Sequence, residues 1–134
     1  MKRAIPLLLL LALPGCATLP QACIAPARPM MTAELLFGRN IGGHVGVSEA
    51  AFAAFTVAEI APRFPDGFTL LDARGQWRDP ARGVVIREPS KLVQIVFTDD
   101  AQKRADLAAI SQAYKTRFRQ ESVLTALHTS CVTF

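Results

Sequence analysis

The sequence predicts an α+β domain with the ferredoxin-like element order β-α-β-β-α-β, an antiparallel four-stranded sheet with two helices on one face. Two segments with helical signals, residues 48–61 and 99–119, alternate with strand-like segments. The two central strand-like segments follow each other directly, as the strands of a hairpin do. The chain of 134 residues is long enough for one such domain and too short for two.

Residues 31–37 are expected to form the first strand, and the glycine-rich loop 38–46 follows it. Ser48 suits the N-cap of the first helix, because its hydroxyl can accept a backbone N–H of the first turn. This helix is expected to end near Ala61, since Pro62 disfavours the helical conformation of the residue before it.

The next two runs, residues 68–77 and 84–97, are strand-like and form a predicted hairpin. Pro89 lies inside the second run and cannot donate a ladder hydrogen bond, so a bulge is expected there. Residues 92–97 would then belong to the sheet core. The residues expected to project from the sheet as an arm are 74–77 and 84–87.

Residues 99–119 predict the second helix, because apolar side chains recur at helical spacing. This stripe consists of Leu107, Ile110, Tyr114 and Phe118. The segment 122–134 closes the chain as a last strand, with an interruption expected near His128.

The first fifteen residues are typical of a secretory leader. Lys2 and Arg3 precede an apolar run over residues 5–13, which is too short to span a bilayer. Cys16 follows directly, in a pattern that resembles a bacterial lipobox. We therefore expect a lipoprotein signal peptide at 1–15 and lipidation of Cys16; the alternative is an ordinary signal peptide cut a few residues later.

Residues 16–30 contain several prolines without a periodic pattern and predict a tether, so that 31–134 form the single domain. The expected location is the bacterial envelope, with the domain facing the periplasm and the membrane bound through the N-terminal lipid. Ala17 follows Cys16, and the absence of aspartate there fits the outer membrane. Without lipidation the protein would be secreted into the periplasm.

The charge balance argues against nucleic-acid binding. Lys2 and Arg3 leave with the leader, so 13 basic and 11 acidic residues remain, and the net charge is only +2. Five arginines between Arg63 and Arg87 are interleaved with aspartates, which is typical of a solvated surface of mixed charge rather than a phosphate-binding stripe.

Two cysteines remain beyond Cys16. Cys23 precedes the first strand and Cys131 lies in the last, and these strands are antiparallel neighbours in the predicted fold. In an oxidising compartment such a pair commonly forms a disulfide. The alternative is a buried free Cys131 with Cys23 exposed or acylated.

Three motifs carry a family resemblance: Pro62-Arg63-Phe64-Pro65-Asp66-Gly67-Phe68-Thr69, Gly75-Gln76-Trp77-Arg78 and Arg87-Glu88-Pro89-Ser90-Lys91. Together they resemble the small bacterial proteins grouped as domain of unknown function 3574, many of which are predicted lipoproteins. The resemblance covers most of 33–134, implies a single envelope domain and supplies no activity. Phe52 departs from it, because relatives tend to carry tryptophan there.

Strong catalytic and metal-binding motifs are absent from the sequence. It has no Gly-x-Ser-x-Gly, no Cys-x-x-Cys and only two histidines, His44 and His128, far apart. We therefore expect no metal and no cofactor. Arg39 precedes a helix N-terminus, where backbone N–H groups attract anions, and is a candidate binding residue.

Glu59 and Tyr114 are the candidate catalytic residues. Glu59 falls inside the apolar arc of the first helix, where a carboxylate must be paired or have its pKa raised. It is either a general acid or base at a pocket rim or one half of an ion pair. The possible partners are Arg63, Arg87 and Arg117, with Pro62 expected to end the helix before Arg63.

Trp77, Arg87 and Glu88 form a second candidate binding cluster on the hairpin, because an aromatic side chain beside arginines suits a ligand or partner surface. The alternative is that Trp77 covers the arm and Arg87 pairs with Glu88 or Asp72. Arg63 is a further candidate binding residue.

The two faces of the predicted sheet differ. Val93, Ile95 and Phe97 are expected to face the helices, while the opposite face remains half apolar. That opposite face carries Glu34, Leu36, Leu92, Gln94 and Val96. Because this face exposes apolar side chains, it predicts a covering partner, and a second copy of the same chain that forms a homodimer is one candidate.

The sequence favours a non-enzymatic binding or envelope-interaction module that uses the Trp77, Arg87 and Glu88 cluster. The alternative is a small cofactor-free enzyme that acts on an anionic small molecule by acid/base chemistry, with Glu59 or Tyr114 transferring the proton.

Overall fold

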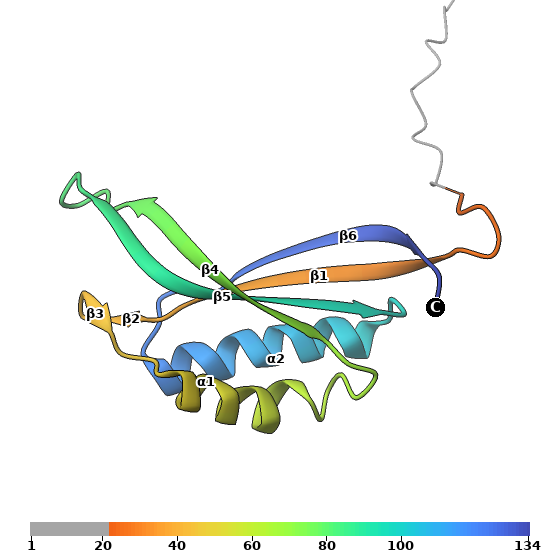
Figure 1. Ribbon diagram of the computed structural model, residues 1–134, viewed down its shortest axis with the longest axis horizontal. Helices are drawn as coiled ribbons and strands as arrows, with labels where there is room; N and C mark the ends of the chain where they lie inside the picture. Colours follow the sequence, from red (N-terminus) through yellow and green to blue (C-terminus); the bar gives the residue numbers. More distant parts are fainter. Residues whose placement is uncertain (1–21) are drawn as a thin grey trace, which may run out of the picture.

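The computed structural model describes residues 22–134, which form one four-stranded antiparallel sheet with two helices packed on one of its faces (Figure 1). The strands lie in the order β4-β5-β1-β6. The predicted ferredoxin-like arrangement is confirmed. The main elements are β1 (Arg28–Gly38), α1 (Glu49–Phe55), β4 (Thr69–Arg78), β5 (Val85–Phe97), α2 (Ala101–Phe118) and β6 (Leu124–Val132). The predicted leader, Cys16 and the predicted tether up to residue 21 lie outside the described residues.

The core lies between the sheet and the helices and follows the period-two alternation of the strands. In β1, Ala33, Leu35 and Phe37 are fully buried while the residues between them are only half-buried. Phe37 contacts an aromatic cluster contributed by both helices, with ring centroids 4.7 Å apart from Tyr114 and 5.6 Å from Phe52. An aromatic side chain at position 52 thus fills the core.

The first helix begins and ends where the sequence predicts. The Ser48 hydroxyl accepts the N–H of Ala51 at 3.1 Å, as an N-cap does. After α1 the backbone widens into a π-helical segment, η1 (Thr56–Ile60), and the N–H of Ala61 reaches back to the carbonyl of Thr56. The helical path therefore stops before Pro62, and only the geometry of its last turn was not foreseen.

The bulge expected at Pro89 is wrong. The β4–β5 register is continuous, with Arg74 opposite Pro89 and no residue inserted. The carbonyl of Pro89 accepts the N–H of Arg39 at 3.1 Å, away from β4. In an antiparallel strand the nitrogen of the same residue points to the same side. Because β1 ends at Gly38, no strand lies there that requires an N–H from Pro89.

The arm itself is present. β1 pairs with β5 only from residue 90 onward, whereas β4 and β5 stay paired to Arg78 and Val85. The end of this hairpin therefore extends past the rest of the sheet and bends away from the helices (Figure 1). We call residues 74–78 and 85–89 the arm.

Three details of the strands differ from the predicted ones. β1 begins at Arg28, so the last residues of the predicted tether belong to the sheet. The glycine-rich loop contains two short paired strands, β2 (Asn40–Ile41) and β3 (His44–Val45). β6 is uninterrupted, and His128 pairs in register with Thr32.

Cys23 and Cys131 form the predicted disulfide, with their Cα atoms 5.5 Å apart. The bridge ties the residues just before β1 to the end of β6, because these strands are antiparallel neighbours. Among the described residues, no helix is both long and apolar enough to cross a membrane.

Candidate functional site

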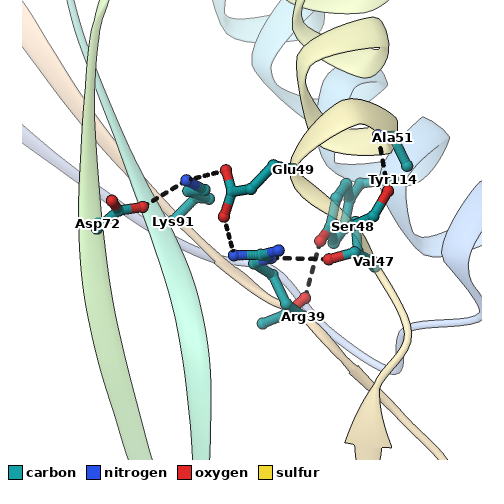
Figure 2. Close-up of polar contacts among 9 residues, drawn as sticks. Arg39, Val47, Ser48, Glu49, Ala51, Asp72, Lys91 and Tyr114 are labelled. Atoms are coloured by element: carbon teal, nitrogen blue, oxygen red, sulfur yellow. Dashed lines mark hydrogen bonds and ion pairs between the residues drawn. The ribbon is translucent and has the colours of Figure 1, made fainter.

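A charged cluster lies where β1 ends and α1 begins (Figure 2). The Arg39 guanidinium donates to the carbonyl of Val47 at 2.8 Å and pairs with Glu49. The ammonium of Lys91 lies between two carboxylates, 2.6 Å from Glu49 and in an ion pair with Asp72. The cluster thus links β1, α1, β5 and β4.

The two cations of this cluster are buried and their carboxylate partners are not. Arg39 and Lys91 are each 8% exposed, whereas the side chains of Glu49 and Asp72 are 68% and 83% exposed. Hydrogen bonds to Asp72 and Glu49 raise the pKa of Lys91, and the same ammonium lowers the pKa of both carboxyl groups. Lys91, Glu49 and Asp72 therefore remain charged at neutral pH, and the cluster holds the first helix against the sheet.

Arg39 therefore has a structural task. Its Nε donates to the carbonyl of Val47 and its Nη1 to the carboxylate of Glu49, so its charge is paired, and the helix beside it has seven residues. The predicted anion site at the glycine-rich loop has no free cation to contribute from this arginine.

Tyr114 is buried in the core, and its hydroxyl donates to the carbonyl of Gly38 at 2.8 Å. Burial raises the pKa of Tyr114 well above its ordinary value. The phenol thus stays protonated at any physiological pH and secures the end of β1 against α2.

Glu59 pairs with Arg63, whose guanidinium lies 2.9 Å from the carboxylate and also donates to the carbonyl of Glu59 at 2.7 Å. Pro62 does not separate them, because the chain turns tightly and the N–H of Arg63 bonds to the carbonyl of Ile60. The geometry corresponds to the ion-pair interpretation, with Arg63 rather than Arg87 or Arg117 as the partner.

The predicted cluster of Trp77, Arg87 and Glu88 is divided between the two faces of the arm. Trp77 lies opposite Ile86 in register, whereas Arg87 lies opposite Gln76. Because neighbouring residues on a strand point to opposite faces, Trp77 and Arg87 belong to different surfaces. The Arg87 Nε donates to the Gln76 Oε1 at 2.9 Å, which places these two side chains together.

A groove of about 480 Å³ lies along the arm, and we call it the arm groove. Its lining residues are Arg74, Gly75, Gln76, Arg87, Glu88 and Pro89. It thus includes two of the predicted binding residues, Arg87 and Glu88, together with Arg74, which the sequence analysis did not single out. The available signal was its spacing, because Arg74 and Gln76 alternate along the predicted strand 68–77.

The arginines of the arm are left without carboxylate partners. Asp72 pairs with Lys91 and Asp79 pairs with Arg82 at 2.6 Å, so these aspartates are engaged elsewhere. Within residues 22–134, neither Arg74 nor Arg87 forms an ion pair. The solvated surface of mixed charge that the sequence predicts therefore presents two guanidinium groups without an ion pair at the groove, whose lining contains one carboxylate, Glu88.

No three histidine, cysteine, aspartate or glutamate side chains gather as metal ligands in the part of the chain that the structure describes. His44 and His128 are both exposed, one on β3 and one on β6.

Residues 32–134 match the model of a protein family described as "Protein of unknown function (DUF3574)". The chain belongs to this family. Comparison with curated protein sequences found no match.

In this DUF3574 domain, two of the three motifs that carry the resemblance face each other across the arm. Gln76 of the second motif pairs with Arg87 of the third, and Gly75 pairs with Glu88. The first motif contains Arg63 and the turn after the first helix. Two of the motifs therefore build the arm groove.

Solved structures with the same fold include a phage SAM lyase in complex with S-methyl-5′-thioadenosine. That structure has a TM-score of 0.63 and 17% identity, over 87% of this chain and 97% of the lyase chain. The lyase in its apo state has a TM-score of 0.59 and 17% identity, over 79% and 90%. CutA from Synechococcus elongatus has a TM-score of 0.51 and 11% identity, over 77% and 78%. At these identities the likeness shows the fold.

Proposed function

We propose that this DUF3574 protein is a lipid-anchored binding module of the bacterial envelope that holds an anionic ligand in the arm groove. The observation that carries the proposal is the pair of arginines, Arg74 and Arg87, which line a groove without carboxylate partners. A volume of about 480 Å³ lies within the range of small-molecule sites. Guanidinium groups favour carboxylate and phosphate ligands, because their planar forks can donate two parallel hydrogen bonds.

The position of the groove favours a soluble ligand over a headgroup of the anchoring membrane. The tether enters the fold at the start of β1, and the arm projects beyond the other end of that strand (Figure 1). Eleven residues of β1 span about 36 Å at the usual rise of a strand. The groove thus faces away from the proposed anchor.

The enzymatic alternative has less support from the geometry. Glu59 is held by Arg63, and the Tyr114 hydroxyl is buried against the carbonyl of Gly38. Neither group lines the arm groove. The structural likeness to a SAM lyase does not supply a reacting group to this chain.

The test is isothermal titration calorimetry on the mature chain, residues 16–134 with Cys16→Ser. Pyrophosphate and citrate serve as anionic probes, and S-methyl-5′-thioadenosine, which the phage SAM lyase holds, serves as a neutral probe. We expect at least one anion to bind, with an affinity that falls as salt is added. Arg74→Gln and Arg87→Gln should each weaken binding about tenfold or more, the value of a charge-assisted hydrogen bond.

Arg117→Gln is the matched control. It removes the same charge from an exposed arginine of α2 that forms no ion pair among residues 22–134. Its affinity should equal that of the parent chain. Equal losses in all three variants, tighter binding of the neutral probe, or no binding of either anion would contradict the proposal.

A further inference from the structure

The face of the sheet that points away from the helices is uncovered among residues 22–134 (Figure 1). Its side chains alternate with the fully buried ones on the other face. Leu36, Leu92 and Val96 are only half-buried there, by their neighbours within the sheet. The same face continues onto the arm, where Trp77 lies opposite Ile86 and is 45% exposed.

A complete row of leucines crosses this face. The register places Leu71 opposite Leu92, Leu92 opposite Leu36, and Leu36 opposite Leu124, so each of the four strands contributes one. Strands lie about 4.8 Å apart, so the row is roughly 15 Å long. The two outer leucines, Leu71 and Leu124, are 47% and 60% exposed. A continuous apolar row of this kind is uncommon on a surface in contact with water.

The next row toward the arm has small side chains. It consists of Ala73, Ser90 and Gly38, about 7 Å along the strands from the leucines. Gly38 leaves room that the Glu88 carboxylate occupies, because a Cβ at position 38 would lie 2.7 Å from the Glu88 Oε2. The leucine row therefore stands higher than the neighbouring small-residue row, and the Glu88 carboxylate lies at the Gly38 end of the small-residue row.

Four polar side chains on the rest of this face bond to one another in two pairs. The Gln94 Nε2 donates to the Glu34 Oε1 at 3.3 Å, and the hydroxyls of Thr32 and Ser130 are 2.8 Å apart. These bonds lower the cost of excluding water from the face, because each group keeps a partner when water leaves.

The size and the shape of the face suit a second copy of this chain. Where β1 pairs with β5, the sheet measures about 19 Å by 27 Å, and the arm adds on the order of 150 Å². The flat area of the face is thus roughly 650 Å², and side chains that project from it add to the area that a partner can cover. A standard interface buries about 800 Å² per partner. A two-fold axis between the leucine row and the small-residue row would place the leucines of each copy over the small side chains of the other.

We propose that two copies of this protein pair through the uncovered faces of their sheets, with the leucine row of each against the small-residue row of the other. The guanidinium group of Arg87 and the amide of Gln76, which line the arm groove, stay outside the pair, because they lie on the opposite side of the arm from Trp77. Of the groove-lining residues, Glu88 has its carboxylate on the paired face, beside Gly38.

Sedimentation velocity on the mature chain with Cys16→Ser tests the pairing, and twice the mass of one chain is expected. Leu124→Glu should raise the dissociation constant tenfold or more. Leu127→Glu is its matched control, since Leu127 is also an exposed leucine of β6 but points to the other face. Ala73→Phe, which fills the small-residue row without adding charge, should weaken the pair as Leu124→Glu does.

The disulfide and the circular dichroism spectrum of each variant show whether it has folded. A single-chain mass at high protein concentration would overturn the proposal. So would a species larger than a pair, or a pair that Leu127→Glu disrupts and Leu124→Glu leaves intact.

Discussion

Lys91 is buried although the residues around it in the sequence do not predict burial. Lysine is rarely buried unless it is paired, and nothing in the local sequence of β5 indicates burial at this position. The register brings Asp72 beside it, and the start of α1 brings Glu49. Because both carboxylates come from distant segments, only the assembled fold shows why this lysine is tolerated. The same assembly takes Asp72 away from Arg87.

The burial of the Tyr114 hydroxyl can be tested by titration, because Tyr114 is the only tyrosine in the chain. Burial raises the pKa of its hydroxyl in the folded protein, while the unfolded chain should ionise near pH 10. The folded state keeps the proton that the unfolded state releases, so the free energy of unfolding should fall as pH rises above about 10, by up to about 1.4 kcal/mol per pH unit.

The measurement is the ultraviolet absorbance of tyrosinate against pH, with and without urea. Ionisation should appear near pH 10 only in urea, and Tyr114→Phe should remove this contribution to the alkaline loss of stability. A folded protein whose tyrosine titrates at its ordinary pKa would show that the hydroxyl is not buried as described.

The secondary structure elements could be predicted because each has a local signal. The N-cap at Ser48, the proline at 62 and the apolar stripe of α2 act over a few residues, and the structure follows them. Pro89 was misinterpreted because its tolerance depends on where β1 ends, which is not a local property. The two short strands of the glycine-rich loop have only two residues each, too few for a periodic pattern.

The disulfide that joins the β1 end of the chain to β6 should stabilise the pairing of these two strands. The disulfide closes a loop with a sequence separation of 108 residues, for which the chain-entropy model gives a stabilisation of about 4–5 kcal/mol. Reduction should therefore lower the free energy of unfolding in urea by about that amount. The double variant Cys23→Ser/Cys131→Ser should show the same loss and no further response to reductant. Equal stability with and without reductant in the parent chain would contradict this prediction.

For the molecule as a whole, the sequence predicts the fold and two of the six residues that line the arm groove. The sequence indicates Arg87 and Glu88 as binding residues, but the cluster with Trp77 is divided, because the alternation of the hairpin places Arg87 on the face opposite to Trp77 and Glu88. The sequence does not indicate Arg74, because Asp72 and Asp79 lie near it in the chain and could neutralise its charge. Only the structure shows that these aspartates pair with Lys91 and Arg82 instead.

The proposed location is also a property of the whole chain. Lipidation of Cys16 should give a mature N-terminal peptide that begins at Cys16 and carries acyl chains, detected by mass spectrometry of protein from the host membrane. Replacing the leader and Cys16 with an ordinary secretory signal and serine should move the protein to the soluble periplasmic fraction. Native protein that begins after Cys16 and is found in the soluble fraction would contradict the anchor.

The bridge between Cys23 and Cys131 has a mechanical consequence for an anchored protein. With the arm held at the other end of the sheet, tension arriving from the N-terminal side would reach β1 and β6 together. The load would run along the strands, at right angles to the hydrogen bonds that join them. Those bonds would be sheared as a group, whereas without the bridge β1 alone would take the pull.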